Sequence, residues 1–114
     1  ALENAGLATV SAEQAAAAAR RILALFDEDR RRIERLGRPA ASALRVFERV
    51  QRNPIVSIPA AAASVGVSAP TVAKSLEYMQ HLGMLREITG RQRHRLFVYD
   101  AYLAILSEGT EPIR

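Results

Sequence analysis

The segment that most constrains the fold is residues 57–83, because it reads as two short helices with a tight turn between them. Ser57 can cap the first helix and Ser68 the second, and each helix has a proline in its first turn, where no useful N–H is lost. Gly66 and Gly83 follow the two helices, and glycine adopts the positive φ that ends a helix without strain. Two helices separated by a few residues that include glycine are typical of the helix-turn-helix.

The second of these helices has two distinct faces. At about 100° per residue, Val72, Leu76 and Met79 share one apolar face. The other face is short, polar and positively charged, and a recognition helix places such residues in the major groove of DNA. The candidate DNA contacts on and beside it are Ser68, Pro70, Thr71, Lys74, Ser75 and Tyr78, with Ser75 at the border of the face. The alternative is an ordinary solvated helix face.

A basic hairpin follows. Residues 84–88 and 95–99 are predicted to be strands, and a glycine turn with dense positive charge joins them. Arg91, Arg93 and Arg95 alternate, and the planar fork of each guanidinium suits phosphate. The hairpin is therefore predicted to be a DNA-binding wing, with contacts from Arg91, Gln92, Arg93, His94 and Arg95. The alternative is a charged tip that keeps an edge strand soluble.

Charge is distributed unevenly along the chain. Residues 38–99 carry nine basic and three acidic side chains, a net charge of +6, whereas residues 1–37 are neutral and residues 100–114 carry −2. A positive excess on the predicted DNA-reading segment is the expected electrostatic footprint. We predict a mainly α fold with a small antiparallel β wing, a winged helix-turn-helix preceded by a long N-terminal helix. The expected units are a linker and long helix (1–37), the winged domain (38–107) and a tail (108–114).

The long helix is predicted to begin after Ser11, which forms a capping box with Gln14, and to run to about Leu36. A run of alanines gives its first half high helix propensity. Its apolar stripe consists of Ala15, Ala19, Ile22, Phe26, Ile33 and Leu36, with Leu23 and Leu25 at the flanks. Asp29 falls inside this stripe and weakens it. Three interpretations stay open: the helix packs on the domain, forms a dimer interface or faces a neighbouring domain.

Three further elements complete the expected fold. A helix is predicted over residues 40–53, between the break at Gly37 and the stop at Pro54. Residues 55–57 are β-branched or polar and are expected to form a short first strand. Asp100 can cap a final short helix over residues 101–107.

Several kinds of chemistry are not expected. The chain has no cysteine and only two histidines, so a zinc site is not predicted. No Walker loop and no Gly-x-Gly-x-x-Gly occurs, no serine has a histidine partner at motif spacing, and no cofactor or catalytic residue is predicted. No apolar run approaches the roughly 20 residues of a membrane span. No secretory signal is visible at the start, and we expect a cytoplasmic protein that does not contact a membrane.

Much of the chain, from about residue 15 onward, resembles the C-terminal region of bacterial Fic-family proteins (filamentation induced by cAMP). The most specific part of the resemblance is residues 90–106, GRQRHRLFVYDAYLAIL. Residues 42–46, 54–58 and 68–72 add to it. Residues 19–37 resemble the long helix that links the Fic domain to this tail.

The resemblance implies a function for the whole protein that this chain does not carry alone. In the family, the Fic domain transfers AMP from ATP to protein hydroxyls through a His-Pro-Phe…Gly-Asn-Gly-Arg loop. That loop is absent here, since neither His81 nor His94 is followed by proline and no Gly-Asn-Gly occurs. The chain is therefore not expected to be an enzyme. It resembles the winged-helix tail, for which the family implies DNA binding.

The leading hypothesis is thus a DNA-binding, transcription-regulating winged-helix module that forms the C-terminal part of a Fic-type AMP-transferase. Its expected partners are double-stranded DNA, an N-terminal Fic domain and a second copy of the chain in a homodimer. One rival is a protein-interaction or dimerisation module that regulates the Fic domain without binding DNA. This rival is favoured by the alanine-rich long helix and by the predicted recognition face, which has no Arg, Asn or Gln before Gln80. Another rival is a free-standing transcription regulator.

Overall fold

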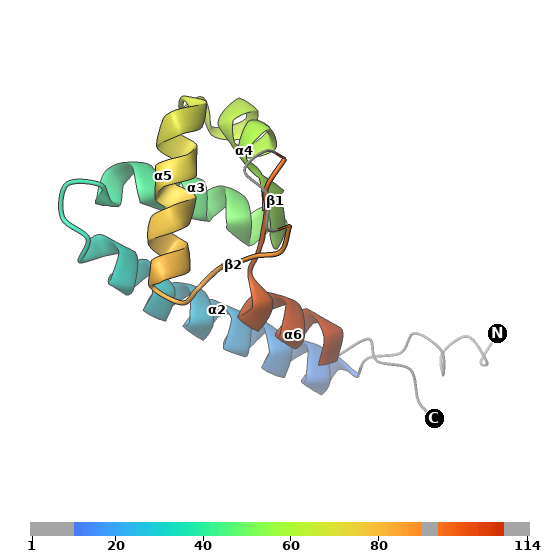
Figure 1. The fold of residues 1–114 in the computed structure, drawn as a ribbon. Coiled ribbons are helices and arrows are strands. Elements are labelled where there is room, and N and C mark those ends of the chain that lie inside the picture. The colour runs from blue at the N-terminus through green and yellow to red at the C-terminus, as the bar shows by residue number, and fades with distance from the viewer. Residues whose placement is uncertain (1–10, 90–93, 109–114) are drawn as a thin grey trace.

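The computed structural model describes residues 11–89 and 94–108, and within them five helices pack with a small sheet that lies at one side of the molecule (Figure 1). In chain order the elements are α2 (Ala12–Glu34), α3 (Ala40–Arg52), β1 (Ile55–Ser57), α4 (Ile58–Val65), α5 (Ala69–His81), β2 (Arg86–Glu87), β3 (Leu96–Val98) and α6 (Asp100–Glu108). The fold is mainly helical with a three-stranded antiparallel sheet, which confirms the coarse part of the predicted fold class.

Side-chain caps set the starts of three helices at the predicted positions. Ser11 and Gln14 form the expected capping box of α2, with both hydrogen bonds 3.0 Å long. The Ser57 hydroxyl accepts from the backbone N–H of Ala60 to cap α4. Ser68 caps α5 in the same way. These contacts lie within four residues of chain, so the sequence pattern alone locates them.

A left-handed residue ends α4 and turns the chain into α5. Gly66 has φ +68° and its N–H donates to the carbonyl of Ala62, as the predicted glycine stop requires. The guanidinium of Arg45 in α3 donates to the carbonyl of Val65, the last residue of α4. The turn is therefore held to α3 from outside as well as by its own backbone.

The sheet has the order β1-β3-β2, with both pairings antiparallel. Val56 of β1 and Glu87 of β2 both pair with Phe97 of β3. The two hairpin strands are shorter than the predicted 84–88 and 95–99. Met84 is buried, and its N–H donates to the carbonyl of Met79 at the end of α5, so its backbone completes a turn and not a strand.

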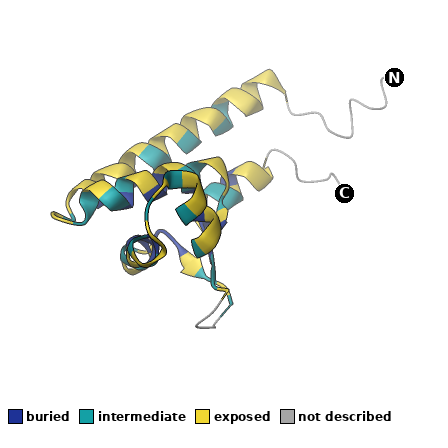
Figure 2. Cartoon of the chain, turned by 90° about the horizontal axis from the view of Figure 1, so that it is seen from above, coloured by how far each residue is buried: buried dark blue, intermediate teal, exposed yellow. Residues whose placement is uncertain are grey.

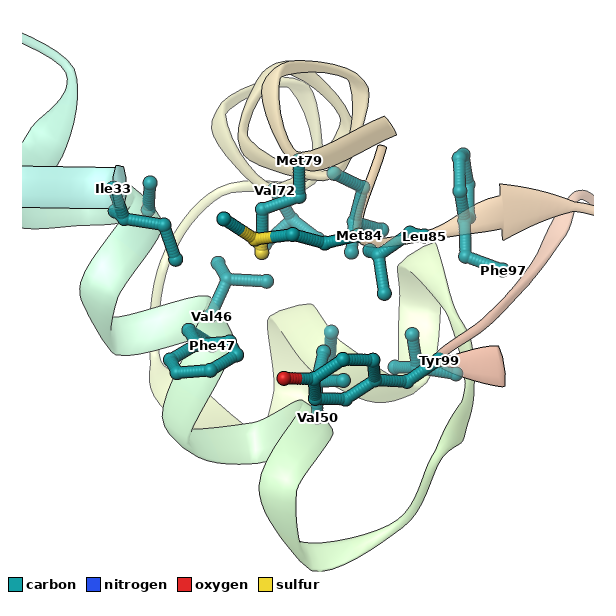
Figure 3. Packing of buried hydrophobic residues seen from close by; sticks show 14 residues of the cluster. Ile33, Val46, Phe47, Val50, Val72, Met79, Met84, Leu85, Phe97 and Tyr99 are labelled. Atoms are coloured by element: carbon teal, nitrogen blue, oxygen red, sulfur yellow. The ribbon is translucent and has the colours of Figure 1, made fainter. Parts of the chain in front are cut away.

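The core lies where α5 crosses α3, and the sheet and the second half of α2 close it (Figures 1 and 3). Its fully buried members include Ile33, Phe47, Leu76 and Tyr99, which come from α2, α3, α5 and the residue after β3. In Figure 3 the Tyr99 ring reaches across the core toward α3. Since Ile33 belongs to this core, the predicted boundary at residue 37 falls between two helices that pack together.

The first half of α2 projects beyond this core, and α6 lies along it (Figures 1 and 2). The predicted stripe is rotated here: Ala15 and Ala19 are exposed, whereas Ala17 and Ala18 are partly covered. The reason is that α6 covers a neighbouring face of α2, where Arg21 pairs with Glu108. Leu23 is left 67% exposed. None of the helices among residues 11–89 and 94–108 is long and apolar enough to cross a membrane.

Candidate nucleic-acid interface

The predicted polar residues of α5 lie together on one side of the helix, away from the core. We call Pro70, Thr71, Lys74, Ser75 and Tyr78 the α5 outer face. Pro70 and Lys74 are exposed, and Thr71 and Tyr78 are half-buried. Val72, Leu76 and Met79 on the opposite side are fully buried, as the helical periodicity predicts.

The hydroxyls at the start of α5 are arranged as a chain of donors. The Ser68 oxygen accepts from the Thr71 N–H at 3.3 Å, and the Ser68 hydroxyl donates to the Thr71 oxygen at 3.0 Å. Ser68 is therefore fully used as a helix cap, which lowers its value as a contact to a ligand. The Thr71 hydroxyl already accepts a bond, so its own proton is available to an acceptor outside the protein.

Ser75 departs from its predicted place at the border of the exposed face. Its residue is only 2% exposed, one of two buried polar residues in the described part of the chain. Ser75 lines a groove of about 320 Å³ that also contacts the rest of the α5 outer face. The far wall of this groove is Pro39 and Ser42, from the start of α3. The helical periodicity of α5 alone does not indicate this groove, because α3 and α5 meet only in the folded chain.

The basic hairpin is seen only in part. Arg91, Gln92 and Arg93 lie outside the described residues. His94 is exposed and has φ +56°. Arg95 does not project freely as the alternating pattern predicts. It donates to Glu77 of α5 at 3.2 Å, its guanidinium lies 5.0 Å from the centre of the Phe97 ring, and its side chain is 20% exposed.

Arg95 therefore acts as a link between α5 and β3, because an acid and an aromatic ring already take up its charge. We therefore do not expect Arg95 to contact phosphate. The alternation of the three arginines gave no sign of this pairing, since Glu77 is 18 positions away in the chain.

A second polar cluster lies at the junction of α2 with the core, and we call Asp29, Arg32 and Tyr99 the α2 junction. The Tyr99 hydroxyl donates to Asp29 at 2.6 Å, and Arg32 donates to the other carboxylate oxygen at 3.2 Å. Arg32 also donates to the carbonyl of Leu82, at the C-cap of α5. Burial, followed by the hydrogen bond to Asp29, raises the pKa of Tyr99 well above its ordinary value.

Asp29 thus explains the interruption of the apolar stripe on α2. It is 4% exposed, and its carboxylate is satisfied by the hydroxyl and the guanidinium. Aromatic rings pack beside the hydrogen bond between Asp29 and Tyr99. The centre of the Phe26 ring in α2 lies 6.1 Å from the centre of the Tyr99 ring and 4.9 Å from that of the Tyr102 ring. The carboxylate is therefore a structural acceptor and not a defect in the helix.

The base of the hairpin is tied to α6 by an exposed ion pair. Arg86 of β2 donates two hydrogen bonds to Asp100, at 2.7 and 3.0 Å. This hydrogen bonding lowers the pKa of the Asp100 carboxyl and raises the pKa of Arg86. Asp100 begins α6, where a negative charge is also favoured by the helix dipole.

The described residues hold no cluster of three or more His, Cys, Asp and Glu side chains that could bind a metal ion. His81 is exposed at the end of α5. The chain matches none of the known protein-family models and none of the curated proteins with which it was compared.

Proposed function

We propose that this chain is a DNA-binding winged-helix module in which α4 and α5 are the helix-turn-helix and β2 with β3 forms the wing. The observation that carries the proposal is the α5 outer face. It presents Lys74 and hydroxyl donors toward solvent, and it contains no carboxylate. It lies in the segment that carries the chain's positive excess. Donors with net positive charge on one helix face suit the phosphates and acceptor edges of DNA.

Backbone contacts are expected to supply most of the affinity. The α5 outer face has no Arg, Asn or Gln for bidentate base recognition, whereas Lys74, Thr71 and Tyr78 can all donate to phosphate oxygens. His94 with Arg91, Gln92 and Arg93 is the proposed second contact, on the wing. Binding of this kind is salt-dependent and depends little on base sequence.

The larger protein is proposed from the sequence resemblance. On this reading, the chain is the C-terminal regulatory part of a Fic-type AMP-transferase, and α2 connects it to the catalytic domain. The resemblance of residues 19–37 to the family's linking helix supports this assignment. Reading the complete coding sequence tests it: a His-Pro-Phe…Gly-Asn-Gly-Arg loop upstream of Ala1 supports the proposal, and its absence favours a free-standing regulator.

Fluorescence anisotropy of a labelled random-sequence duplex tests DNA binding. We expect a dissociation constant in the micromolar range at low salt that rises steeply as salt is added, because released counterions drive the association. Lys74→Ala should flatten the log–log salt slope by about one, the value for one lost phosphate contact. Arg20→Ala is the matched control, since Arg20 is exposed on α2 and lies in the neutral segment.

The second candidate function is a protein-interaction or dimerisation module, and the observation in its favour is the exposed Leu23 on α2. Folded protein that binds no duplex at low salt, and that sediments as a dimer at every salt concentration, would favour this candidate over DNA binding.

A further inference from the structure

The groove between α3 and α5 combines apolar surface with several hydrogen-bond donors. It is bounded on one side by Pro39 and Ser42 and on the other by the α5 outer face, and its volume is about 320 Å³. Hydroxyls and one ammonium group line it, and no carboxylate does. An anion is the ligand that such a set of donors can bind without an unfavourable charge contact.

The wall from α3 adds backbone donors. Pro39 is the N-cap of this 13-residue helix, no side chain caps it, and its first turn contains no acidic residue. The Ala40 N–H donates to Gly37, and Ala43 donates to Pro39. Within the described residues, the N–H groups of Ala41 and Ser42 have no acceptor. Unused first-turn N–H groups together with the helix dipole favour a negative charge at this end.

Ser75 is the independent sign that a ligand belongs here. The residue is only 2% exposed, it lines the groove, and no hydrogen bond of its hydroxyl is found among residues 11–89 and 94–108. The hydroxyl oxygen is not among the fully buried atoms that lack a partner, which are Arg49 Nη1 and Gln51 Nε2, so it is open to the groove. Buried hydroxyls in folded proteins are normally hydrogen-bonded. Ser75 therefore offers a hydroxyl at the groove surface that is not taken up by another group in the described residues.

We propose that this groove binds one phosphate group of the DNA backbone beside the recognition helix, held by Ser42, Ser75 and Lys74 and by the first turn of α3. The inference rests on the proposed function, because the groove is continuous with the α5 outer face and a bound duplex would present phosphates to both. It adds a contact from α3, which lies outside the helix-turn-helix. Thr71 contributes as well, since its hydroxyl proton is free to donate.

Two substitutions test the site without weakening the fold. Ser75→Ala removes a hydroxyl for which no hydrogen bond is found in the described residues, and Ser42→Asp places an acid in the first turn of α3, where the dipole favours it. We expect both variants to melt at the wild-type temperature or above. Duplex affinity should fall by about tenfold in Ser75→Ala, and by tenfold or more in Ser42→Asp with a salt slope flatter by about one.

Ala24→Asp is the control for added charge, because Ala24 is exposed on α2 away from the groove. Wild-type duplex binding that is unchanged in both groove variants would overturn the site and leave the proposed function standing. Inorganic phosphate is the second probe, followed through the amide NMR signals of Ser42 and Ser75. These signals could shift with inorganic phosphate while the wild type binds no duplex. In that case the groove binds free phosphate and not a phosphate of DNA, and the proposed function is wrong as well. If the wild type binds no duplex and phosphate shifts neither signal, both the groove site and the proposed function are overturned.

Discussion

The α2 junction and the α5 outer face are both polar, but their polar groups differ in where the partners come from. At the junction, the carboxylate of Asp29 is satisfied by Tyr99 and Arg32, so the cluster is closed within the protein. On the outer face, Lys74 is exposed and the Ser75 side chain lines the groove beside it. The comparison teaches that a satisfied polar cluster serves stability, whereas an unsatisfied one is available to a ligand.

The largest effect is expected when the closed cluster loses its acceptor. Asp29→Ala leaves the Tyr99 hydroxyl buried without a partner and removes the ion pair of Arg32. Unfolding free energy should fall by about 2–4 kcal/mol, the usual cost of breaking a buried charged network. Urea denaturation measures the change, and Asp27→Ala, whose pair with Arg31 is exposed, should cost no more than about 0.5 kcal/mol.

The same variant sharpens the contrast with the outer face. Duplex affinity of Asp29→Ala, measured at a temperature where the variant is still folded, should equal that of the wild type. A tenfold loss of affinity with the fold intact would show that the two regions are not separate in function.

The second effect is a pH dependence at the junction. Tyr99→Phe removes the bond to Asp29 and should cost about 1.5–3 kcal/mol at neutral pH. The folded pKa of Tyr99 is raised above the unfolded value of about 10, so this contribution is complete below pH 10 and is lost as pH rises further.

Thermal melts of wild type and Tyr99→Phe should therefore differ most at pH 8 and converge toward pH 11. Tyr102→Phe is the control, because Tyr102 lies in the same aromatic cluster. A difference between wild type and Tyr99→Phe that stays constant over this range would contradict the hydrogen-bond account.

The smallest effect concerns Arg95, which the sequence pattern groups with the DNA contacts but which the structure pairs with Glu77 and Phe97. Arg95→Ala should lower stability by about 1 kcal/mol through loss of the Glu77 pair and the contact with Phe97. The salt slope for duplex binding should not change. A slope flatter by about one, as for Lys74→Ala, would return Arg95 to the phosphate contacts.

Local signals in the sequence located the elements well. The caps at Ser11, Ser57 and Ser68 and the stop at Gly66 depend on neighbours within four residues, so their positions follow from the printed chain. The hairpin strands were predicted too long, because Met84 completes a turn after α5 and is not paired in the sheet. Whether Met84 belongs to a turn or to a strand depends on tertiary packing, which a short stretch of sequence does not reveal.

The candidate site was predicted only in part, for the same reason. Thr71, Lys74 and Tyr78 follow from helical periodicity, but the burial of Ser75 and the participation of Ser42 need the crossing of α3 and α5. Of the two partners of Asp29, Arg32 is three positions away, but Tyr99 is 70 positions away. One signal was present: an acid inside an apolar stripe indicates a buried partner as readily as a weak helix.

The bond from Arg32 to the Leu82 carbonyl has a mechanical consequence. It attaches α2 to the end of α5, while the Tyr99 bond attaches it to the end of β3. The 23-residue helix is roughly 34 Å long, so it acts as a lever whose fulcrum is the junction. The arm from the junction to Ser11 is roughly 30 Å, so a tilt of about 10° at α5 displaces the Ser11 end by roughly 5 Å. Repositioning of α5 against a bound surface is therefore amplified at the far end of α2, and a pull at that end is delivered to α5.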